Sequence, residues 1–466
     1  MKTLVIDLTH GGVKIAVSLA KKGHEVYCYD IYNTLKGIDK RMLEVYNIKL
    51  IQLEDLKEFE GELKVIYPIH LPLTHEDIKK YNPSLNYTFT THHKAIGEIL
   101  NGWGDDIDKI EITGVKGKTS CAFMLKEILM DKNPLILSSL GALIYEDGKE
   151  IVLQKNISIT PANIKESVDL AYKLANPVCG GEVKDRIYNC AIFESSLGAC
   201  GIGDVGLLTN IVEDYPIAKN RSRASIAKKQ VFDCNIVWCE KESLDKYYND
   251  IKHPAVNSFS INDETANLYV SNVNYSLDET VIDIKFRNIS TKNQKSVNGD
   301  ITIKTFAPGP HHVLNVLGVV GVALSLNIDE DKIINGLENY KGIPGRTNKR
   351  IIGNRVIIEE INPGINTKAI EASINMLENK SDYLISIGGD YGITCEEIDE
   401  DTVGKLIDNL DEEIILTGEV GKSILNKISK KVRFIEDYNK VYELAFENNK
   451  NLLFIYRSDY RKLSKR

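Results

Sequence analysis

The sequence predicts an α/β protein with three domains, for three reasons. At 466 residues, 43% of them hydrophobic, the chain is longer than one compact core and long enough for two or three domains. Short apolar strands alternate with amphipathic helical patterns, which is typical of parallel sheets covered by helices. Polar, Gly-containing segments at 101–108 and 341–350 separate these runs and mark the expected boundaries.

The first domain is expected over residues 1–108. KTLVIDL predicts a strand, THGG a turn, VKIAVSLAKKGH a helix and EVYCYDIY a second strand, which together make a βαβ unit. Asp30 lies at the end of the second strand, but the turn has only Gly11 and Gly12 and lacks the G-x-G-x-x-G pattern of dinucleotide sites. A Rossmann-like unit that binds substrate, or is purely structural, is therefore favoured over a dinucleotide site.

The central domain is expected over residues 109–346 and the C-terminal domain over 347–466. Apolar strands such as KIEITGV, NCAIFESS and CNIVWCE alternate with helices and predict a mainly parallel central sheet. ALIYEDGKEIVLQ predicts a hairpin, and alternating residues between 267 and 306 predict an antiparallel extension of the same domain. The remainder repeats strand and helix, which predicts a second Rossmann-like domain.

Charge and cysteine content argue against several classes of protein. A formal net charge of −8 and a pI near 5.7 disfavour a general affinity for nucleic acid or anionic membranes. No export signal and no apolar run long enough to span a bilayer is apparent, so a cytoplasmic protein is expected. A monomer is also expected. The eight cysteines form no Cys-x-x-Cys pair and no zinc-like spacing with His, which predicts reduced, mostly buried thiols at Cys28, Cys121, Cys179, Cys190, Cys200, Cys234, Cys239 and Cys395.

The segment EITGVKGKTS, residues 111–120, resembles a phosphate-binding loop between a strand and a helix. Backbone N–H groups of such a turn can bind phosphates, Lys118 would meet the β and γ oxygens, and Thr119 or Ser120 would meet Mg²⁺. A strict Walker A motif needs glycine where this chain has Ile112, so an exposed loop lysine is the alternative interpretation. The motif favours a central domain of the P-loop ATPase type.

Two downstream segments strengthen the phosphate hypothesis. Glu194 ends an apolar strand, where a carboxylate can bind a metal beside a P-loop, although a helix cap or a surface acid is an equal alternative. TNIVEDYPIAKNRSRASIAKKQVF then carries a basic run, made of Lys219, Arg221, Arg223, Lys228 and Lys229. A solvated surface is the ordinary interpretation of such a run, whereas beside a phosphate site it could bind a carboxylate-rich substrate.

Five short motifs in this order resemble the Mur ligase superfamily. They are G-x-x-G-K-T/S, E-x-S, T-N-x-x-x-D with a downstream A-K-x-x-x-F, G-x-x-x-x-x-N opening a helix, and P-G-R. Mur ligases use ATP to activate a carboxylate as an acyl phosphate, and their short loop lacks the early glycine. The resemblance therefore implies ATP and Mg²⁺ as cofactors and accounts for Ile112.

The resemblance also implies roles for individual residues. Nucleotide contacts fall on Gly114, Val115, Lys116, Gly117, Lys118, Thr119, Ser120, Asn315 and Arg346. Metal ligands fall on Thr119, Glu194 and Lys228, with Lys228 matching a lysine that Mur ligases often carry as a carbamate. Catalysis would rest on Lys118, Glu194 and Lys228.

This chain departs from the family at three places. Tyr215 stands where Mur ligases have His after the Asp of T-N-x-x-x-D, which puts the second metal site in doubt. His312 stands where Asn is usual. EEINPG replaces a D-Y-A-H segment and leaves Glu359 or Glu360 as the candidate ribose contact.

DLTHGG, THHKAIGEIL and SLGACGIGDVGLLTNIVEDYPIA look more specifically like the coenzyme F-430 synthetases, Mur-ligase homologues of methanogenic archaea. That resemblance implies that ATP activates a propionate side chain and that a carbon nucleophile closes the last carbocycle of a nickel tetrapyrrole. A small-molecule polycarboxylate needs cationic contacts, for which Lys219, Arg221 and Arg223 are candidates. His10, His92 and His93 are candidates for a substrate-facing surface, although capping or loop histidines are commoner.

Two other functions stay open on the sequence. A pseudomurein peptide ligase would add an amino acid to a nucleotide-linked peptide, but GGDYGITCEEID in the C-terminal domain offers no Arg or Lys for the incoming carboxylate. A P-loop nucleotide-binding protein without ligase activity would be favoured if Glu194 and Lys228 lay far from Lys118.

Overall fold

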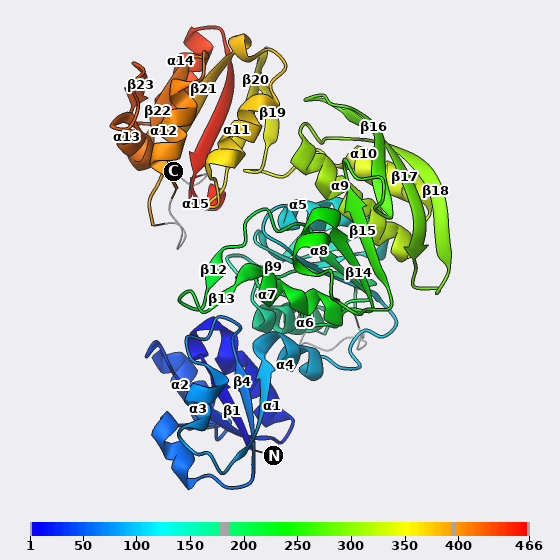
Figure 1. Ribbon diagram of the computed structural model, residues 1–466, viewed down its shortest axis with the longest axis vertical. Coiled ribbons are helices and arrows are strands. Elements are labelled where there is room, and N and C mark those ends of the chain that lie inside the picture. The colour runs from blue at the N-terminus through cyan, green and yellow to red at the C-terminus, as the bar shows by residue number, and fades with distance from the viewer. Residues whose placement is uncertain (1, 177–185, 393–397, 464–466) are drawn as a thin grey trace. The chain divides into compact units, whose positions relative to one another are not determined.

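The computed structural model describes residues 2–176, 186–392 and 398–463 (Figure 1). They form two compact units, one made of residues up to 271 with 283–301 and 314–336, the other of 272–282, 302–313 and the residues from 337 onward. The first large sheet and most of the second belong to the same unit, so the three-domain division stays a prediction.

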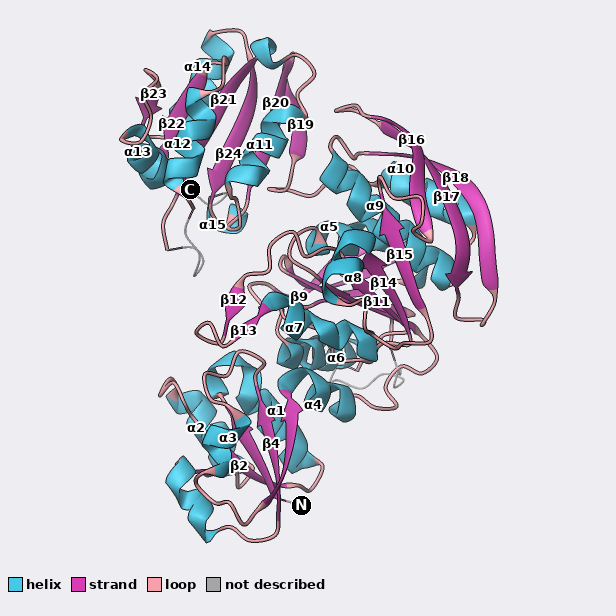
Figure 2. Cartoon of the chain, in the orientation of Figure 1, coloured by secondary structure: helices cyan, strands magenta, loops and turns pink. Residues whose placement is uncertain are grey.

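The first sheet has the strand order β3-β2-β1-β4-β5, and every pairing is parallel. Leu4 and Ile6 pack on one face and Val5 on the other, so both faces are buried under helices, as Figure 2 shows. The strands are β1 (Lys2–Ile6), β2 (Glu25–Tyr29), β3 (Lys49–Leu50), β4 (Glu62–Tyr67) and β5 (Asn86–Thr91), and the α-helices are α1 (Val13–Lys21), α2 (Gly37–Val45), α3 (His75–Lys79) and α4 (His92–Ile99). The chain segments that follow β1 and β4 therefore meet at one edge of the sheet.

The second sheet has eleven strands in the order β18-β17-β16-β15-β14-β11-β6-β10-β7-β8-β9. Its strands from β16 to β7 are parallel, and β7 to β9 are antiparallel, which confirms the predicted hairpin. The strands β6 (Asp108–Thr113), β7 (Leu135–Ser138), β10 (Cys190–Glu194) and β11 (Val205–Leu208) are almost wholly buried and lie side by side. Their carboxyl ends therefore present a common edge.

The other elements of this part extend the sheet on both sides or connect its strands. The remaining strands are β8 (Gly141–Glu146), β9 (Lys149–Gln154), β14 (Ile236–Glu240), β15 (Val256–Ser260), β16 (Leu268–Asn274), β17 (Thr280–Ser290) and β18 (Ser296–Thr305), with a small β12–β13 pair (Pro216–Ile217, Ser222–Arg223). The α-helices are α5 (Lys118–Ile128), α6 (Pro161–Ala175), α7 (Ala224–Lys228), α8 (Lys241–Tyr247), α9 (Pro310–Ser325) and α10 (Glu330–Asn339).

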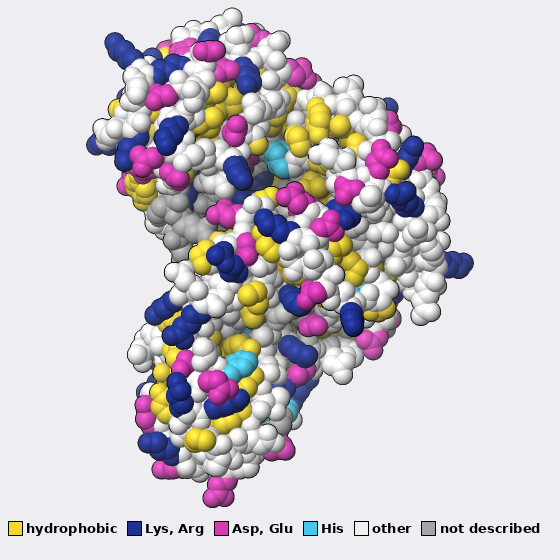
Figure 3. All heavy atoms as spheres, viewed as in Figure 1, with side chains coloured by type: hydrophobic (Ala, Val, Ile, Leu, Met, Phe, Trp, Pro, Cys, Tyr) yellow, Lys and Arg dark blue, Asp and Glu magenta, His cyan; other side chains and the backbone are white. Residues whose placement is uncertain are grey.

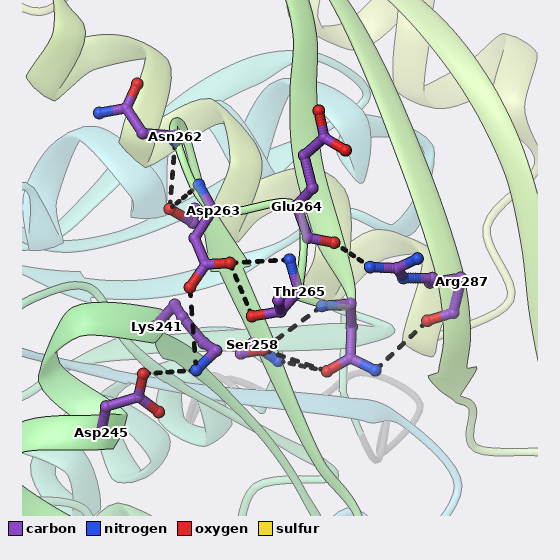
Figure 4. A network of polar contacts seen from close by, with 10 residues as sticks. Lys241, Asp245, Ser258, Asn262, Asp263, Glu264, Thr265 and Arg287 are labelled. Atoms are coloured by element: carbon purple, nitrogen blue, oxygen red, sulfur yellow. Dashed lines mark hydrogen bonds and ion pairs between the residues drawn. The ribbon is translucent and has the colours of Figure 1, made fainter.

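A polar network closes the turn between β15 and β16 (Figure 4). The Asp263 carboxylate accepts from Thr265 N and Oγ1 at 2.8 and 2.6 Å, and lies 4.0 Å from Lys241 Nζ. Lys241 also pairs with Asp245 on α8, and the Arg287 guanidinium donates to the Glu264 carbonyl. These polar contacts join the turn to α8 and β17.

The third sheet, in the order β19-β20-β24-β21-β22-β23, is parallel except for its β19–β20 edge. Its strands are β19 (Asn348–Ile352), β20 (Arg355–Ile361), β21 (Tyr383–Gly389), β22 (Ile414–Thr417), β23 (Arg433–Ile435) and β24 (Asn451–Arg457). Its α-helices are α11 (Thr367–Asn375), α12 (Glu400–Asp408), α13 (Gly418–Leu425), α14 (Asn439–Glu447) and α15 (Tyr460–Leu463). This sheet confirms the predicted Rossmann-like arrangement.

Acidic and basic side chains are interspersed over the face drawn in Figure 3. Within the described ranges, no helix has both the length and the apolar character required to cross a membrane. Six cysteines are buried free thiols, as predicted, whereas Cys179 and Cys395 lie outside the described residues.

Candidate active site

The GVKGKTS turn connects β6 to α5, and its backbone requires glycine at two positions. Gly114 has φ of 137° and Gly117 has φ of 85°. A Cβ on Gly114 would lie 2.0 Å from Thr209 Oγ1, and a Cβ on Gly117 would lie 2.0 Å from Asn315 Oδ1. The turn therefore packs directly against the residue that follows β11 and against α9, and the Asn315 side chain lies against the phosphate-binding loop.

The Thr-Asn pair of T-N-x-x-x-D holds the loop from the side. Thr209 Oγ1 donates to the Lys116 carbonyl at 2.6 Å, and Asn210 Nδ2 donates to the same oxygen at 3.2 Å. Lys116 N donates to Asn210 Oδ1 at 3.2 Å, and Val115 N donates to the Asn210 carbonyl at 2.9 Å. This motif therefore fixes the shape of the loop.

Lys118 starts α5, and its side chain folds back over the loop. Its ammonium group donates to the Gly114 carbonyl at 3.0 Å and to the Val115 carbonyl at 3.4 Å. The first N–H groups of an eleven-residue helix and this cation lie together, an arrangement that favours a bound anion.

Glu194 meets Thr119 at the carboxyl ends of β10 and β6. Thr119 Oγ1 donates to the two carboxylate oxygens at 3.1 and 3.0 Å, and Ser139 N donates to Oε2 at 3.0 Å. The Glu194 side chain is only 2% exposed, yet its partners are hydroxyl and amide groups rather than a cation. These oxygen donors fit a magnesium ion, which prefers carboxylate and hydroxyl oxygens.

Ser139 is a further residue of this site, which no sequence motif predicts. Its hydroxyl lies 3.0 Å from Thr119 Oγ1. The available signal was its position directly after β7, which neighbours β10 in the sheet.

Lys228, the last residue of α7, is fully buried. Its ammonium group donates to the Ser196 carbonyl at 2.5 Å, two residues beyond Glu194, and lies 5.9 Å from the centre of the Tyr215 ring. Burial, with a smaller contribution from the Lys118 charge, lowers the pKa of Lys228 well below its ordinary value. This environment disfavours the charged ammonium form and so favours the neutral, nucleophilic amine more than an exposed site would.

Asp214 holds the helix that carries Lys228, a role the sequence did not reveal. Its carboxylate accepts from Ser225 N at 2.8 Å and from Ser225 Oγ at 3.0 Å, near the start of α7. Arg223 Nη1 donates to the Asp214 carbonyl at 2.7 Å, so this basic residue already has a partner.

The other two basic candidates lie on the β12–β13 hairpin. Lys219 is exposed in a turn whose three residues from 218 to 220 have positive φ. Arg221 Nη1 donates to the Pro72 carbonyl at 2.5 Å and lies 3.4 Å from Asp77 Oδ2. Arg221 therefore joins the hairpin to the first sheet's loops.

His92 and His93 begin α4 and are both buried. His92 Nε2 donates to the Ile6 carbonyl at 3.0 Å, and His93 Nε2 lies 3.3 Å from Ser195 Oγ. Burial lowers the pKa of His92 to about 4 and that of His93 to about 3, so both rings are neutral near pH 7. His93 thus reaches the residue next to Glu194. His10, by contrast, has 44% of its side chain exposed.

Glu111 supports the site from beneath and is wholly buried. Its carboxylate accepts from three backbone N–H groups, those of Cys200 at 2.6 Å, Ile202 at 2.9 Å and Gly203 at 3.1 Å. Burial raises the pKa of Glu111, and these hydrogen bonds partly offset the rise. Strand β6, which precedes the phosphate loop, therefore also holds residues 200–203, the segment before β11.

The second compact unit contains Arg346, Glu359 and Glu360. Glu360 is buried and accepts from Thr347 Oγ1 at 2.6 Å; burial raises its pKa, and the nearby Arg346 charge opposes the rise. Glu359 accepts from Tyr442 OH at 2.9 Å and pairs with Arg350. Both carboxylates thus have partners within their own unit.

Comparison with known proteins gives concordant results. Residues 349–459 match the family model "Coenzyme F430 synthetase CfbE, C-terminal domain". The coenzyme F(430) synthetase of Methanocaldococcus jannaschii is 27% identical over 94% of this chain and 96% of its own length, and that of Methanosarcina acetivorans is 26% identical over 90% of each.

The fold also has a solved counterpart. The MurF ligase of Thermotoga maritima in complex with ADP covers 87% of this chain and 93% of its own, with a TM-score of 0.55 and 15% identity. The resemblance predicted from the sequence is therefore confirmed: the chain is similar to coenzyme F(430) synthetases over nearly its whole length, and it has the fold of a Mur ligase.

Proposed function

We propose that this enzyme uses ATP to phosphorylate a propionate side chain of a nickel tetrapyrrole and then closes the last carbocycle of coenzyme F-430. The observation that carries the ATP step is the gathering of Thr119, Glu194 and Lys228 beside the Lys118 loop. The choice of substrate rests on the near full-length similarity to F(430) synthetases.

The chemistry needs two displacements. A carboxylate oxygen attacks the γ-phosphorus, and the β–γ bridging oxygen leaves with ADP, which gives an acyl phosphate. A carbon nucleophile of the same substrate, having lost its proton, then attacks the acyl carbon, and phosphate leaves. Lys118 and the N–H groups at the start of α5 would offset the charge on the transferred phosphoryl group.

Magnesium would be held by Thr119 and Glu194, with Ser139 beside them. Bound Mg²⁺ supplies charge neutralisation to the phosphates. Lys228 would react with CO₂ as the neutral amine and become a carbamate, which adds a negatively charged oxygen ligand. Tyr215 replaces the family's histidine near this lysine, so the carbamate would supply more of the second site's donor set.

Substrate and location follow from the same proposal. Lys219 is the candidate contact for peripheral carboxylates, with Arg221 and Arg223 contributing only if their present partners exchange. Arg346 would be a nucleotide contact from the C-terminal part. We infer a cytoplasmic monomer acting on a small molecule, with no nucleic-acid or membrane partner.

A pseudomurein peptide ligase is the second candidate, because it would use the same Mg²⁺-ATP chemistry. A P-loop protein without ligase activity is the third. It is disfavoured because Glu194 contacts Thr119 and Lys118 is close enough to influence the Lys228 pKa.

The deciding experiment measures phosphate release from ATP with purified full-length protein and Mg²⁺. One reaction contains the seco-tetrapyrrole acid, and the other contains a nucleotide-linked peptide with amino acids. We expect release with the tetrapyrrole, at least a hundredfold less in Lys118→Ala, and unchanged release in the exposed-lysine control Lys229→Ala. Release with the peptide alone would instead identify an amino-acid ligase, and full activity of Lys118→Ala would contradict the acyl-phosphate mechanism.

A further inference from the structure

Three side chains with metal-binding atoms converge at the carboxyl edge of the first sheet. Asp7 follows β1, His10 lies in the turn after it, and His70 follows β4, the neighbour of β1. One ligand atom from each residue lies within 4.8 Å of the others. The group arises from two strand ends that the sequence separates by about sixty residues.

The distances among these atoms resemble those around a bound transition metal. His70 Nε2 lies 3.3 Å from His10 Nδ1 and 3.5 Å from Asp7 Oδ2. Donors about 2.1 Å from one ion at tetrahedral or octahedral angles are roughly 3.0–3.4 Å apart. The third pair, His10 Nδ1 and Asp7 Oδ2, is a hydrogen bond of 2.6 Å, and replacing its proton with an ion requires only a small lengthening.

The carboxylate is held in place by its own backbone. Asp7 has φ of 72°, a left-handed conformation that is costly for a residue with a Cβ. Its Oδ1 accepts from Thr9 N at 2.9 Å and His10 N at 3.3 Å, which leaves Oδ2 directed at the imidazoles. Ligating carboxylates are commonly oriented by such outer hydrogen bonds.

The surroundings suit an ion that exchanges with solvent. Asp7 is fully buried, whereas 44% of the His10 side chain and 27% of the His70 side chain are exposed. We propose that Asp7, His10 and His70 bind a divalent transition-metal ion, such as Zn²⁺ or Ni²⁺, through two imidazole nitrogens and one carboxylate oxygen. Imidazole suits both ions, and three donors on one side leave positions open for water or a substrate oxygen.

The site lies against the central sheet's helix α6. A Cβ on Gly11 would lie 2.4 Å from the Cβ of Ala162, so the His10 turn touches the start of that helix. Ser196, whose carbonyl accepts from Lys228, donates its N–H to the Ile159 carbonyl just before α6. A short run of contacts therefore connects the metal site to the catalytic edge.

The test uses chelator-stripped full-length protein in equilibrium dialysis with Zn²⁺, without ATP, Mg²⁺ or a carboxylate substrate. We expect one ion per chain, and at least a tenfold loss of affinity in His10→Gln and in His70→Gln. His24→Gln is the matched control, because His24 precedes β2 and lies at the opposite edge of the same sheet. With Co²⁺ in place of Zn²⁺, visible absorption bands should appear in wild type and weaken in both variants.

Circular dichroism checks that each variant is folded. Wild-type affinity in both histidine variants, or equal losses in His24→Gln, would assign the bound ion to another site and overturn the proposal. Absence of stoichiometric binding to wild type would overturn it as well. Because neither nucleotide nor tetrapyrrole is present, the result is independent of the proposed ligase reaction.

Discussion

At the residue scale, Lys228 combines features that ordinary surface lysines lack. It is fully buried, has a carbonyl partner, and has its pKa lowered first by burial and then by the Lys118 charge. Carbamate formation requires the neutral amine, which an exposed lysine rarely provides at pH 7. The same environment therefore both disfavours the ammonium form and permits the proposed reaction with CO₂.

We expect substrate-dependent phosphate release to fall at least tenfold in CO₂-depleted buffer and to recover when bicarbonate is added. Lys228→Arg should be nearly inactive under both conditions, because a guanidinium does not form a stable carbamate. Lys229→Arg, at the adjacent exposed position, should behave as wild type. A carbonyl ¹³C signal from labelled bicarbonate, present in wild type and absent in Lys228→Arg, would identify the adduct. Equal activity with and without CO₂ would rule out a functional carbamate.

At the scale of elements, the conformation of the phosphate loop depends on the helix α9 packed against it as well as on the loop's own sequence. Gly117 adopts a left-handed conformation and has the Asn315 amide directly against it. The loop can therefore keep its shape only while α9 stays packed on it. A single methyl group should disturb both the turn and the approach of Asn315.

Gly117→Ala should lower ATP affinity at least tenfold and destabilise the fold by about 1–2 kcal/mol from backbone strain alone. Gly148→Ala is the matched control, because Gly148 also has positive φ, 77°, but has open space around it. Gly148→Ala should lower the free energy of unfolding, measured in urea, by a similar amount. Its ATP affinity, measured by calorimetry, should be unchanged. Weaker ATP binding in both variants would mean that global destabilisation, not loop geometry, is responsible.

At the scale of the whole molecule, the N-terminal sheet is joined to the central one by polar side chains that are buried or partly buried. His93 contacts Ser195, and Thr91 Oγ1 donates to Gln230 Oε1 at 2.6 Å. His93 is neutral when folded, because burial depresses its pKa to about 3, and it would be free to protonate when unfolded. Folding stability should consequently depend on mild acidity.

Below pH 6.5 His93 binds a proton in the unfolded chain but not in the folded chain. The contribution of His93 to the free energy of unfolding is therefore complete above pH 6.5 and declines as the pH falls toward 3. Between pH 7 and pH 5 the free energy of unfolding of wild type should fall by at most about 2 kcal/mol more than that of His93→Gln, because a shift of one pKa unit corresponds to about 1.36 kcal/mol. Urea unfolding at the two pH values measures the difference. An equal loss in both proteins would show that His93 titrates normally.

The sequence was sufficient for features that are local. The strand, glycine turn and helix around Lys118 are contiguous, so the phosphate loop could be predicted, and the resemblance extended this to Asn315 and Lys228. Ser139 and Asp214 could not be assigned, because their roles depend on strand order and on a helix start that no short motif encodes. His10 was predicted as a substrate contact, but its pairing with Asp7 and His70 requires knowing that β1 lies beside β4.

Glu111 bears on how mutational data for this enzyme should be interpreted. Three N–H groups converge on its carboxylate, and an amide would set its own NH₂ against at least one of them. Even the isosteric substitution Glu111→Gln should therefore abolish activity in a mutational screen. Glu111 lies only three residues before Gly114 of the phosphate loop. This loss of activity could be mistaken for the loss of a catalytic acid, whereas its cause would be misfolding of the segment that Glu111 holds. Measuring the amount of soluble, folded protein would distinguish the two explanations.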